Sequence, residues 1–183
     1  IRTFGFYHAG QDCTAACRVY AQKGIYERFV GKLGQAVSSI KYGLQDDPNT
    51  ELGPRITEQH RQKVVGMVER AKAQPHITVI TGGNAVAGPG FFFEPTVLAG
   101  ALQSDEIVQR EVFGPVLHVA TFRARDLPRV VAEINATGYG LTFGLHSRID
   151  DRVQQVVEQV QAGNLYVNRN QIGAVVGSQP FGG

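Results

Sequence analysis

The fold class is decided by residues 116–167, which read VLHVATFRARDLPRVVAEINATGYGLTFGLHSRIDDRVQQVVEQVQAGNLYV. Three apolar, β-prone runs alternate there with two segments whose valine, leucine and isoleucine residues recur at helical spacing. Such alternation is typical of a mainly parallel sheet covered by helices. The strands are predicted at 116–122, 141–147 and 165–167, and the helices after Asp126 and after Asp150, the second ending at Gly163.

The same alternation extends towards the N-terminus. Apolar side chains between Ile25 and Ile40 fall on one helical face, and Thr57 is a good N-cap for a further helix. Further strands are predicted at 77–81 and 91–98, joined by a turn or hairpin loop in the glycine-rich stretch 82–90. The sequence therefore predicts an α/β fold, an open and mainly parallel sheet flanked by helices, with residues 1–183 as a single domain.

Composition excludes several classes of protein. The net charge is only +2 and Lys and Arg are scattered among Asp and Glu, which argues against nucleic-acid binding. No apolar run reaches the roughly 18 residues that a membrane span requires. Two cysteines are too few for a disulfide scaffold and favour a reducing, cytoplasmic compartment. No GxGxxG dinucleotide fingerprint and no metal-ligand spacing of Cys or His occurs, so no metal site is expected.

Cys13 is the most suggestive candidate for chemistry. It follows Gly10 and Gln11-Asp12 in a run that could begin a helical turn, where the positive end of the backbone dipole would stabilise a thiolate nucleophile. His8 could serve it as a general base, although no spacing rule brings the two side chains together. For Cys17, a small buried apolar side chain is the better interpretation.

Two further clusters have unusual local composition. Glu111–Val116 places a carboxylate before an aromatic residue and a Gly-Pro turn, and its simplest interpretation is a strand-entry turn with a solvated Glu. The tail Asn164–Gly183 is a strand that runs into a glycine-punctuated loop of low charge. Free backbone N–H groups in such a loop suit an anion-binding nest, and structural packing explains the composition equally well.

Taken together, these clusters resemble one family, the aldehyde dehydrogenases. The similar segments occur in the family's order and span essentially the whole chain. They are Gly10–Cys13 (GQDC), Glu111–Val116 (EVFGPV), Gly138–Leu141 (GYGL) and Gln179–Gly183 (QPFGG), with the turns Glu51–Pro54 (ELGP) and Phe93–Thr96 (FEPT). The resemblance implies the family's catalytic domain, an open α/β sheet.

The resemblance also implies a mechanism and a cofactor. Cys13 would attack an aldehyde to form a thiohemiacetal and then a thioester. The backbone N–H of Cys13 and an Asn side chain would donate hydrogen bonds to the oxyanion. Glu111 would hold the ribose hydroxyls of NAD, or of NADP, with Phe113 packed beside them. In the family the cofactor domain, the general-base Glu and the Asn all precede the nucleophile, and a homo-oligomer is expected. We therefore expect the 183-residue chain alone to turn over no aldehyde, and an aldehyde-dependent rise in NADH absorbance would refute this.

The two halves resemble different subfamilies. From about Leu117 the chain is similar to the pyrroline-5-carboxylate (glutamate semialdehyde) dehydrogenase module of bifunctional proline-utilisation enzymes. That resemblance implies that the N–H groups of Gly173 and Ala174 bind the substrate α-carboxylate, that Thr14 supplies a hydroxyl where Ser is usual, and that Phe181 lines the aliphatic chain. The first half looks more like aminobutyraldehyde or betaine-aldehyde dehydrogenases, so the chain is a divergent member or a mosaic.

Glutamate semialdehyde is the leading substrate, because the second half carries the anchor loop that would discriminate a carboxylate from a cation. An aminobutyraldehyde or betaine-aldehyde substrate is the alternative within the family. A non-catalytic structural or oligomerisation domain of the same fold is the alternative from another class.

Overall fold

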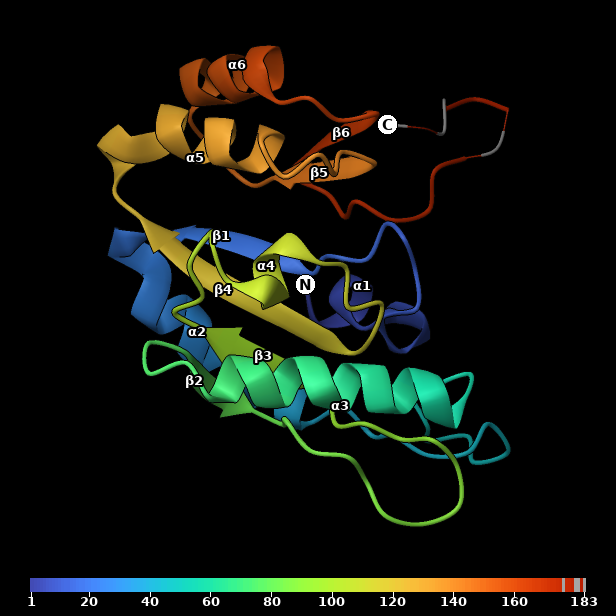
Figure 1. The fold of residues 1–183 in the computed structure, drawn as a ribbon. Coiled ribbons are helices and arrows are strands. Elements are labelled where there is room, and N and C mark those ends of the chain that lie inside the picture. The colour runs from blue at the N-terminus through green and yellow to red at the C-terminus, as the bar shows by residue number, and fades with distance from the viewer. Residues whose placement is uncertain (176, 180–181, 183) are drawn as a thin grey trace. The chain divides into compact units, whose positions relative to one another are not determined.

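The computed structural model describes residues 1–175, 177–179 and 182. The chain divides into two compact units, Ile1–Thr121 and Phe122–Gly183 (Figure 1). Each unit has its own sheet and its own apolar core. Both lie within the segment that the sequence predicts as one domain, and that prediction stays open.

The first unit is built on a four-stranded sheet in the order β1-β4-β3-β2. The strands β3 and β4 run parallel, with Thr96 opposite Val116, whereas β2 runs antiparallel to β3, with Thr78 opposite Ala99. Residues 82–95 therefore form the loop of a β-hairpin, as the glycine-rich stretch predicts. The strand bounds are β1 Arg18–Gln22, β2 Thr78–Thr81, β3 Thr96–Ala99 and β4 Val116–Phe122.

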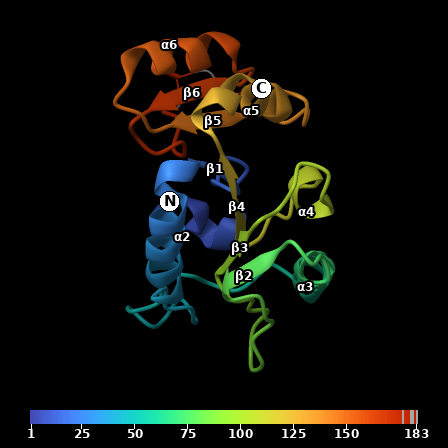
Figure 2. The same cartoon turned by 90° about the vertical axis from the view of Figure 1, so that its left-hand side faces the viewer.

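Helices cover both faces of this sheet. Figure 2 shows α2 on one face and α3 and α4 on the other. Each face has its own apolar cluster, and the period-two alternation of β3 supplies both, because Val97 packs with α2 and Leu98 with α3. The bounds are α1 Arg2–Gly5, the short turn η1 Tyr7–Gly10, α2 Lys23–Ser38, α3 Glu58–Lys72 and α4 Glu106–Gln109.

The second unit is a smaller α/β arrangement of two parallel strands and two helices. Thr142 of β5 lies opposite Asn164 of β6. Val131, Val156 and Val160 form its buried core, against which side chains from both strands pack. The elements are η2 Ala124–Asp126, α5 Leu127–Asn135, β5 Thr142–Leu145, α6 Asp150–Gln159 and β6 Asn164–Val167.

The structure confirms the α/β class and the mostly parallel pairing, and it corrects several boundaries. The helix after Asp150 ends at Gln159 rather than at Gly163, because Val160 turns to extended backbone and is buried in the core. Residues 91–95 are not part of β3, and Phe93 makes only an isolated bridge to Ala85. The sequence does not predict the strand β1, because its residues, RVYAQ, do not alternate clearly between apolar and polar side chains.

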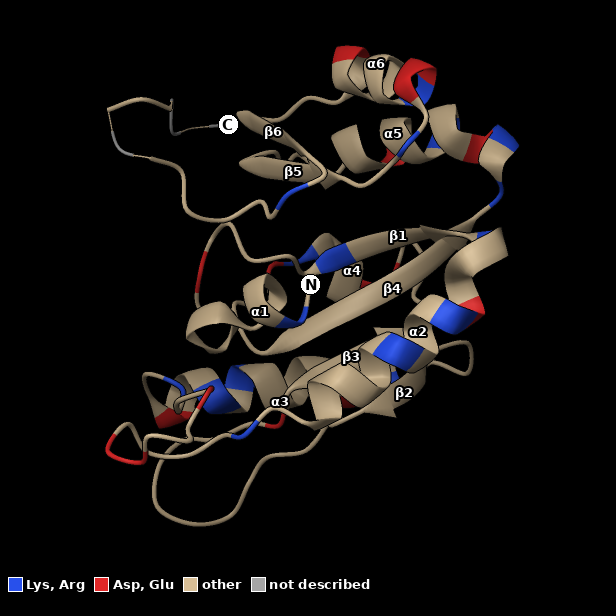
Figure 3. Ribbon diagram, turned by 180° about the vertical axis from the view of Figure 1, so that it is seen from behind, with Lys and Arg blue, Asp and Glu red and all other residues tan. Residues whose placement is uncertain are grey.

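Charged residues of both signs occur along α2, α3, α5 and α6 (Figure 3). Within the described residues, no helix combines the length and the apolar character that crossing a membrane needs.

We expect His118 on β4 to make the fold sensitive to acid. It is 4% exposed, and burial lowers the pKa of its imidazole to about 3. Since the unfolded chain binds this proton from about pH 6.5 downward and the folded chain does not, stability is lost as the pH falls from about 6.5 to about 3, by about 1.4 kcal/mol per pH unit. Urea unfolding at a series of pH values should show a shallower loss for His118→Gln. The exposed His146→Gln is the control, and identical slopes for both variants and the wild type would contradict the assignment.

Candidate active site

The chain bends sharply just before Cys13. His8, Ala9 and Gly10 have φ values of 47°, 56° and 68°, so three consecutive residues are left-handed and two of them are not glycine. A left-handed non-glycine residue costs of order 1–3 kcal/mol and persists only where its surroundings hold it. We call residues 8–14, which contain the predicted nucleophile Cys13, the nucleophile loop.

Asp12 organises the second part of the nucleophile loop. Its Oδ1 accepts hydrogen bonds from the N–H of Thr14 at 2.7 Å and from the hydroxyl of Thr14 at 2.6 Å, and its carbonyl accepts from the N–H of Ala15. This is an Asx-type turn rather than the start of a helix. The prediction that a helix terminus stabilises a Cys13 thiolate is therefore wrong, because Asp12 ties the backbone into a turn that leads to β1.

Cys13 lies exposed at the tip of this turn. Its backbone N–H donates to no described residue, so this group is available to a ligand. Thr14 is buried, and its hydroxyl would have to leave Asp12 in order to donate to a substrate. His8 is exposed and makes no hydrogen bond to Cys13 among the described residues.

Cys17 is also exposed, which corrects the expectation of a small buried side chain. It stands immediately before β1, where its carbonyl accepts a hydrogen bond from the N–H of His118. Although part of its surface is exposed, the protein atoms packed around the thiol desolvate the thiolate and raise the pKa of Cys17.

The loop of residues 111–115 lies directly against the nucleophile loop. A Cβ added to Gly10 would stand 1.9 Å from the carbonyl oxygen of Gly114, so the two backbones touch and leave no room for a side chain. Phe113 is half-buried in a left-handed conformation, with φ 56°. Glu111 is exposed, and its carbonyl accepts from Nζ of Lys63 at 3.3 Å. The structure thus brings together two segments that lie a hundred residues apart in the sequence.

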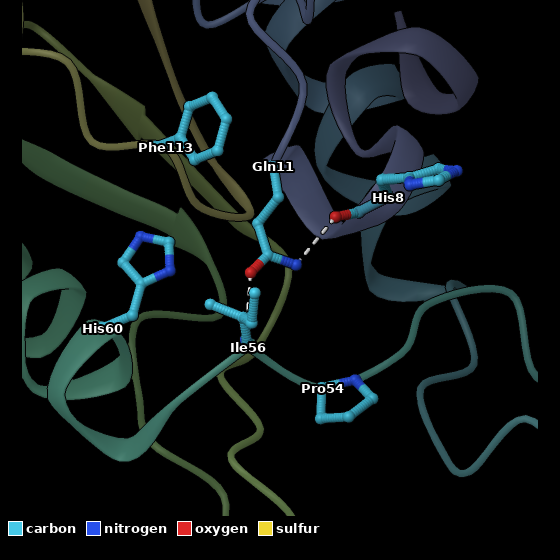
Figure 4. Close-up of a pocket in the computed structure, with 6 residues that line it drawn as sticks. All are labelled: His8, Gln11, Pro54, Ile56, His60 and Phe113. Atoms are coloured by element: carbon cyan, nitrogen blue, oxygen red, sulfur yellow. Dashed lines mark hydrogen bonds between the residues drawn. The ribbon is translucent and has the colours of Figure 1, made fainter.

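A pocket of about 630 Å³ opens beside these loops. In Figure 4 the side chain of Gln11 lies at its centre, with Oε1 accepting from the N–H of Ile56 at 3.0 Å and Nε2 donating to the carbonyl of His8 at 3.2 Å. The rings of His60 and Phe113 are 6.2 Å apart and tilted by 31°. The lining residues are His8, Gln11, Pro54, Ile56, His60 and Phe113.

Sequence reasoning missed His60, although Thr57 gave a usable signal. The Thr57 hydroxyl accepts from the N–H of His60 at 3.1 Å, which caps α3 and fixes His60 in its first turn. Burial, together with the positive charges of Arg55 and Lys63, lowers the pKa of His60. These effects favour the neutral imidazole.

The predicted carboxylate-binding residues belong to the second unit. Gly173 is exposed and left-handed, with φ 75°, and Ala174 is half-buried. Neither backbone N–H donates to a described residue. Phe181 lies outside the described residues. In the described part of the chain, no group of three His, Cys, Asp or Glu side chains could hold a metal ion.

We expect Gly10→Ala to destabilise the protein by at least about 2 kcal/mol, because the new Cβ meets a backbone carbonyl and φ is positive. Gly31→Ala is the matched control. Gly31 lies in α2 with nothing within 4 Å of an added Cβ, so this change should stabilise by about 0.5–1 kcal/mol. Denaturant unfolding of the 183-residue chain measures both, and effects of the same sign would contradict the packing described for Gly10.

Comparison with known proteins gives a consistent picture. The model of the aldehyde dehydrogenase family matches residues 1–183. The bifunctional protein PutA of Rhizobium meliloti is 47% identical over 182 residues, which are 99% of this chain and 15% of that protein. The betaine aldehyde dehydrogenase of Cereibacter sphaeroides is 35% identical over 178 residues, 97% of this chain and 36% of that protein.

Among solved structures, a 1-pyrroline-5-carboxylate dehydrogenase superimposes with a TM-score of 0.90 at 32% identity, covering 99% of this chain and 34% of that one. The chain therefore spans between about a seventh and a little over a third of the length of these relatives. Both subfamilies that the two halves resemble are found, and each match runs along nearly the whole chain. The family match over every residue, together with this α/β fold, identifies the chain as a member of the aldehyde dehydrogenase family.

Proposed function

We propose that this chain provides the catalytic domain of an NAD(P)-dependent aldehyde dehydrogenase in which Cys13 is the nucleophile. The observation that carries the proposal is the contact between Gly10 and Gly114, which sets the exposed Cys13 loop against the loop of Glu111 and Phe113. These are the two segments to which the family resemblance assigns the nucleophile and the ribose contact. A purely structural domain would have no need to hold an exposed thiol on a strained loop beside a pocket.

The chemistry begins at the sulfur of Cys13. Its thiolate adds to the aldehyde carbon, a C–S bond forms, and the carbonyl π electrons move onto the oxygen. We propose that the backbone N–H of Cys13, which donates to no described residue, donates to that oxyanion. Loss of hydride from the same carbon leaves a thioester on Cys13, and water then releases the acid. For that water we propose a general-base Glu, with an Asn as second oxyanion donor, from the cofactor domain that precedes this segment in the family.

The pocket supports the proposal of a nicotinamide nucleotide site beside Phe113. Its volume falls within the 300–1,000 Å³ usual for small-molecule sites, and it combines aromatic and apolar side chains with a few polar groups. We propose that Glu111 binds the ribose hydroxyls and that Phe113 packs beside them. The bound cofactor supplies the acceptor for the hydride. Aldehyde dehydrogenases generally use NAD(P), and we propose NAD for this chain, with NADP as the alternative.

Glutamate semialdehyde is the proposed substrate. The similarity to PutA and to a 1-pyrroline-5-carboxylate dehydrogenase supports it. The exposed, left-handed Gly173 and the N–H groups of Gly173 and Ala174 suit an anion-binding nest for a carboxylate. We propose that Thr14 and Phe181 contribute the hydroxyl and the apolar contact. Aminobutyraldehyde or betaine aldehyde is the second candidate, because a betaine aldehyde dehydrogenase matches 97% of the chain.

The setting of the protein is part of the proposal. Cys13 and Cys17 are both free thiols, which supports a reducing compartment such as the cytoplasm. We further propose that the working enzyme combines this chain with a cofactor-binding domain and forms a homo-oligomer.

We expect a chimera that carries this chain in place of the matched segment of the Rhizobium meliloti PutA to oxidise aldehyde. Cys13→Ser should lower its kcat by at least about a hundredfold, because a hydroxyl is a far weaker nucleophile than a thiolate. Cys17→Ser is the matched control, an exposed thiol four residues away that should keep most of the activity. NADH formation measures the rates, and an active Cys13→Ser chimera would overturn the assignment.

Ala174→Leu tests the substrate in the same chimera. A larger side chain beside the proposed nest should raise the KM for glutamate semialdehyde by at least about tenfold, while leaving the KM for aminobutyraldehyde unchanged. Ala136→Leu, at an exposed position, controls for general damage. A wild-type chimera that prefers the amine-bearing aldehyde would contradict glutamate semialdehyde as the substrate.

A further inference from the structure

Arg55 is an unusual residue for the interior of a small domain. It is 2% exposed and precedes the pocket residue Ile56 in the segment that leads to α3. Burying an unpaired charge costs free energy, so a buried arginine without a carboxylate partner needs an explanation. Among the described residues no ion pair involves Arg55.

The guanidinium lies between the nucleophile loop and the 111–115 loop. Its Nη1 donates a hydrogen bond to the carbonyl of Ala9, one of the two left-handed non-glycine residues of the nucleophile loop. The same Nη1 stands 3.4 Å from where a Cβ of Gly114 would lie. The backbone N–H of Arg55 donates to the carbonyl of Phe91 at 2.9 Å, which fixes its own position.

The next residue holds the other end of the bend. The N–H of Ile56 donates to Oε1 of Gln11, whose Nε2 donates to the carbonyl of His8 (Figure 4). Residues 55–56 therefore form hydrogen bonds to Ala9 and to Gln11, the residues on either side of Gly10 in the strained turn. Cys13 follows two residues after Gln11.

Stability alone does not account for an arginine here. Nε and Nη2 are buried and have no hydrogen-bond partner among the described residues. Burial disfavours the charged form of the guanidinium and lowers its pKa to about 10. An apolar side chain of similar length would avoid this penalty and would lose only the bond to Ala9.

We propose that Arg55 is a positioning residue for the nucleophile, holding the left-handed turn at Ala9 against the 111–115 loop and so setting where Cys13 stands. The inference rests on the proposed function for its catalytic consequence. The claim that Arg55 holds the nucleophile loop in place does not depend on that function, because amide exchange in the loop can be measured without any turnover. Misplacing a reacting group by about 1 Å can cost of order a hundredfold in rate, so a single bond that fixes this loop has a large effect on turnover.

Hydrogen exchange of the 183-residue chain tests the positioning itself. In Arg55→Met the amides of Ala9 and Gln11, which donate to the carbonyls of Phe6 and His8, should exchange at least about tenfold faster, with the α3 amides unchanged. Arg55→Lys, which keeps one cationic donor, should restore most of the protection. Arg28→Met, at an exposed position of α2, is the control. Unchanged exchange at Ala9 and Gln11, or faster exchange throughout the first unit, would overturn the proposal.

Kinetics of the chimera tests the consequence. Arg55→Met should lower kcat at least about tenfold with less than a threefold change in the KM for NAD, and Arg55→Lys should recover most of it. Equal losses of kcat in Arg55→Met and Arg55→Lys, or a fall in kcat matched by a fall in melting temperature, would show that Arg55 has only a structural role and would overturn the proposal. If the wild-type chimera oxidises no aldehyde, the proposed function fails, while the exchange experiment still decides whether Arg55 holds the loop.

Discussion

The backbone contact between Gly10 and the carbonyl of Gly114 is the constraint on which the candidate site depends. It joins the segment before Cys13 to the segment after Glu111, and it is possible only because Gly10 has no side chain. The left-handed conformations of His8 and Ala9 are the local cost of this approach. Bonds from Arg55 to Ala9 and from Ile56 to Gln11 hold the bend in place.

Much of the fold follows from hydrophobic periodicity. The helices α2, α3 and α5 and the strand β4 lie where the spacing predicts them, because each presents a long apolar face to a core. Short elements were harder to predict. The strand β1 forms because β4 offers it a partner in the sheet, a relation between distant residues that local pattern does not contain.

The candidate site likewise contains some residues that the sequence identifies and others that only the structure reveals. Cys13, Glu111 and Phe113 could be named from motif resemblance, and the structure brings their loops together. The sequence gives no sign of Arg55, since an arginine between proline and isoleucine suggests an ordinary surface residue, and for His60 it offers only the capping Thr57, which predicts a place in the first turn of a helix and no role. Only the burial of Arg55 and the ring contact of His60 with Phe113 reveal their place beside the pocket. The prediction that a helix dipole stabilises a Cys13 thiolate is wrong because Oδ1 of Asp12 accepts a hydrogen bond from the N–H of Thr14, which forms a turn and not a helix.

The alternation of Val97 and Leu98 on β3 has a consequence for how the first unit comes apart. One strand contributes to the apolar clusters on both faces of the sheet, and β4 does the same through Val116 and Leu117. Loss of either cluster withdraws support from a strand that the other cluster needs. The apolar clusters on the two faces of the sheet in residues 1–121 are therefore thermodynamically coupled. A substitution that leaves a cavity beneath α2 also weakens the packing of α3 on the opposite face, although the coupling requires no contact between the two helices.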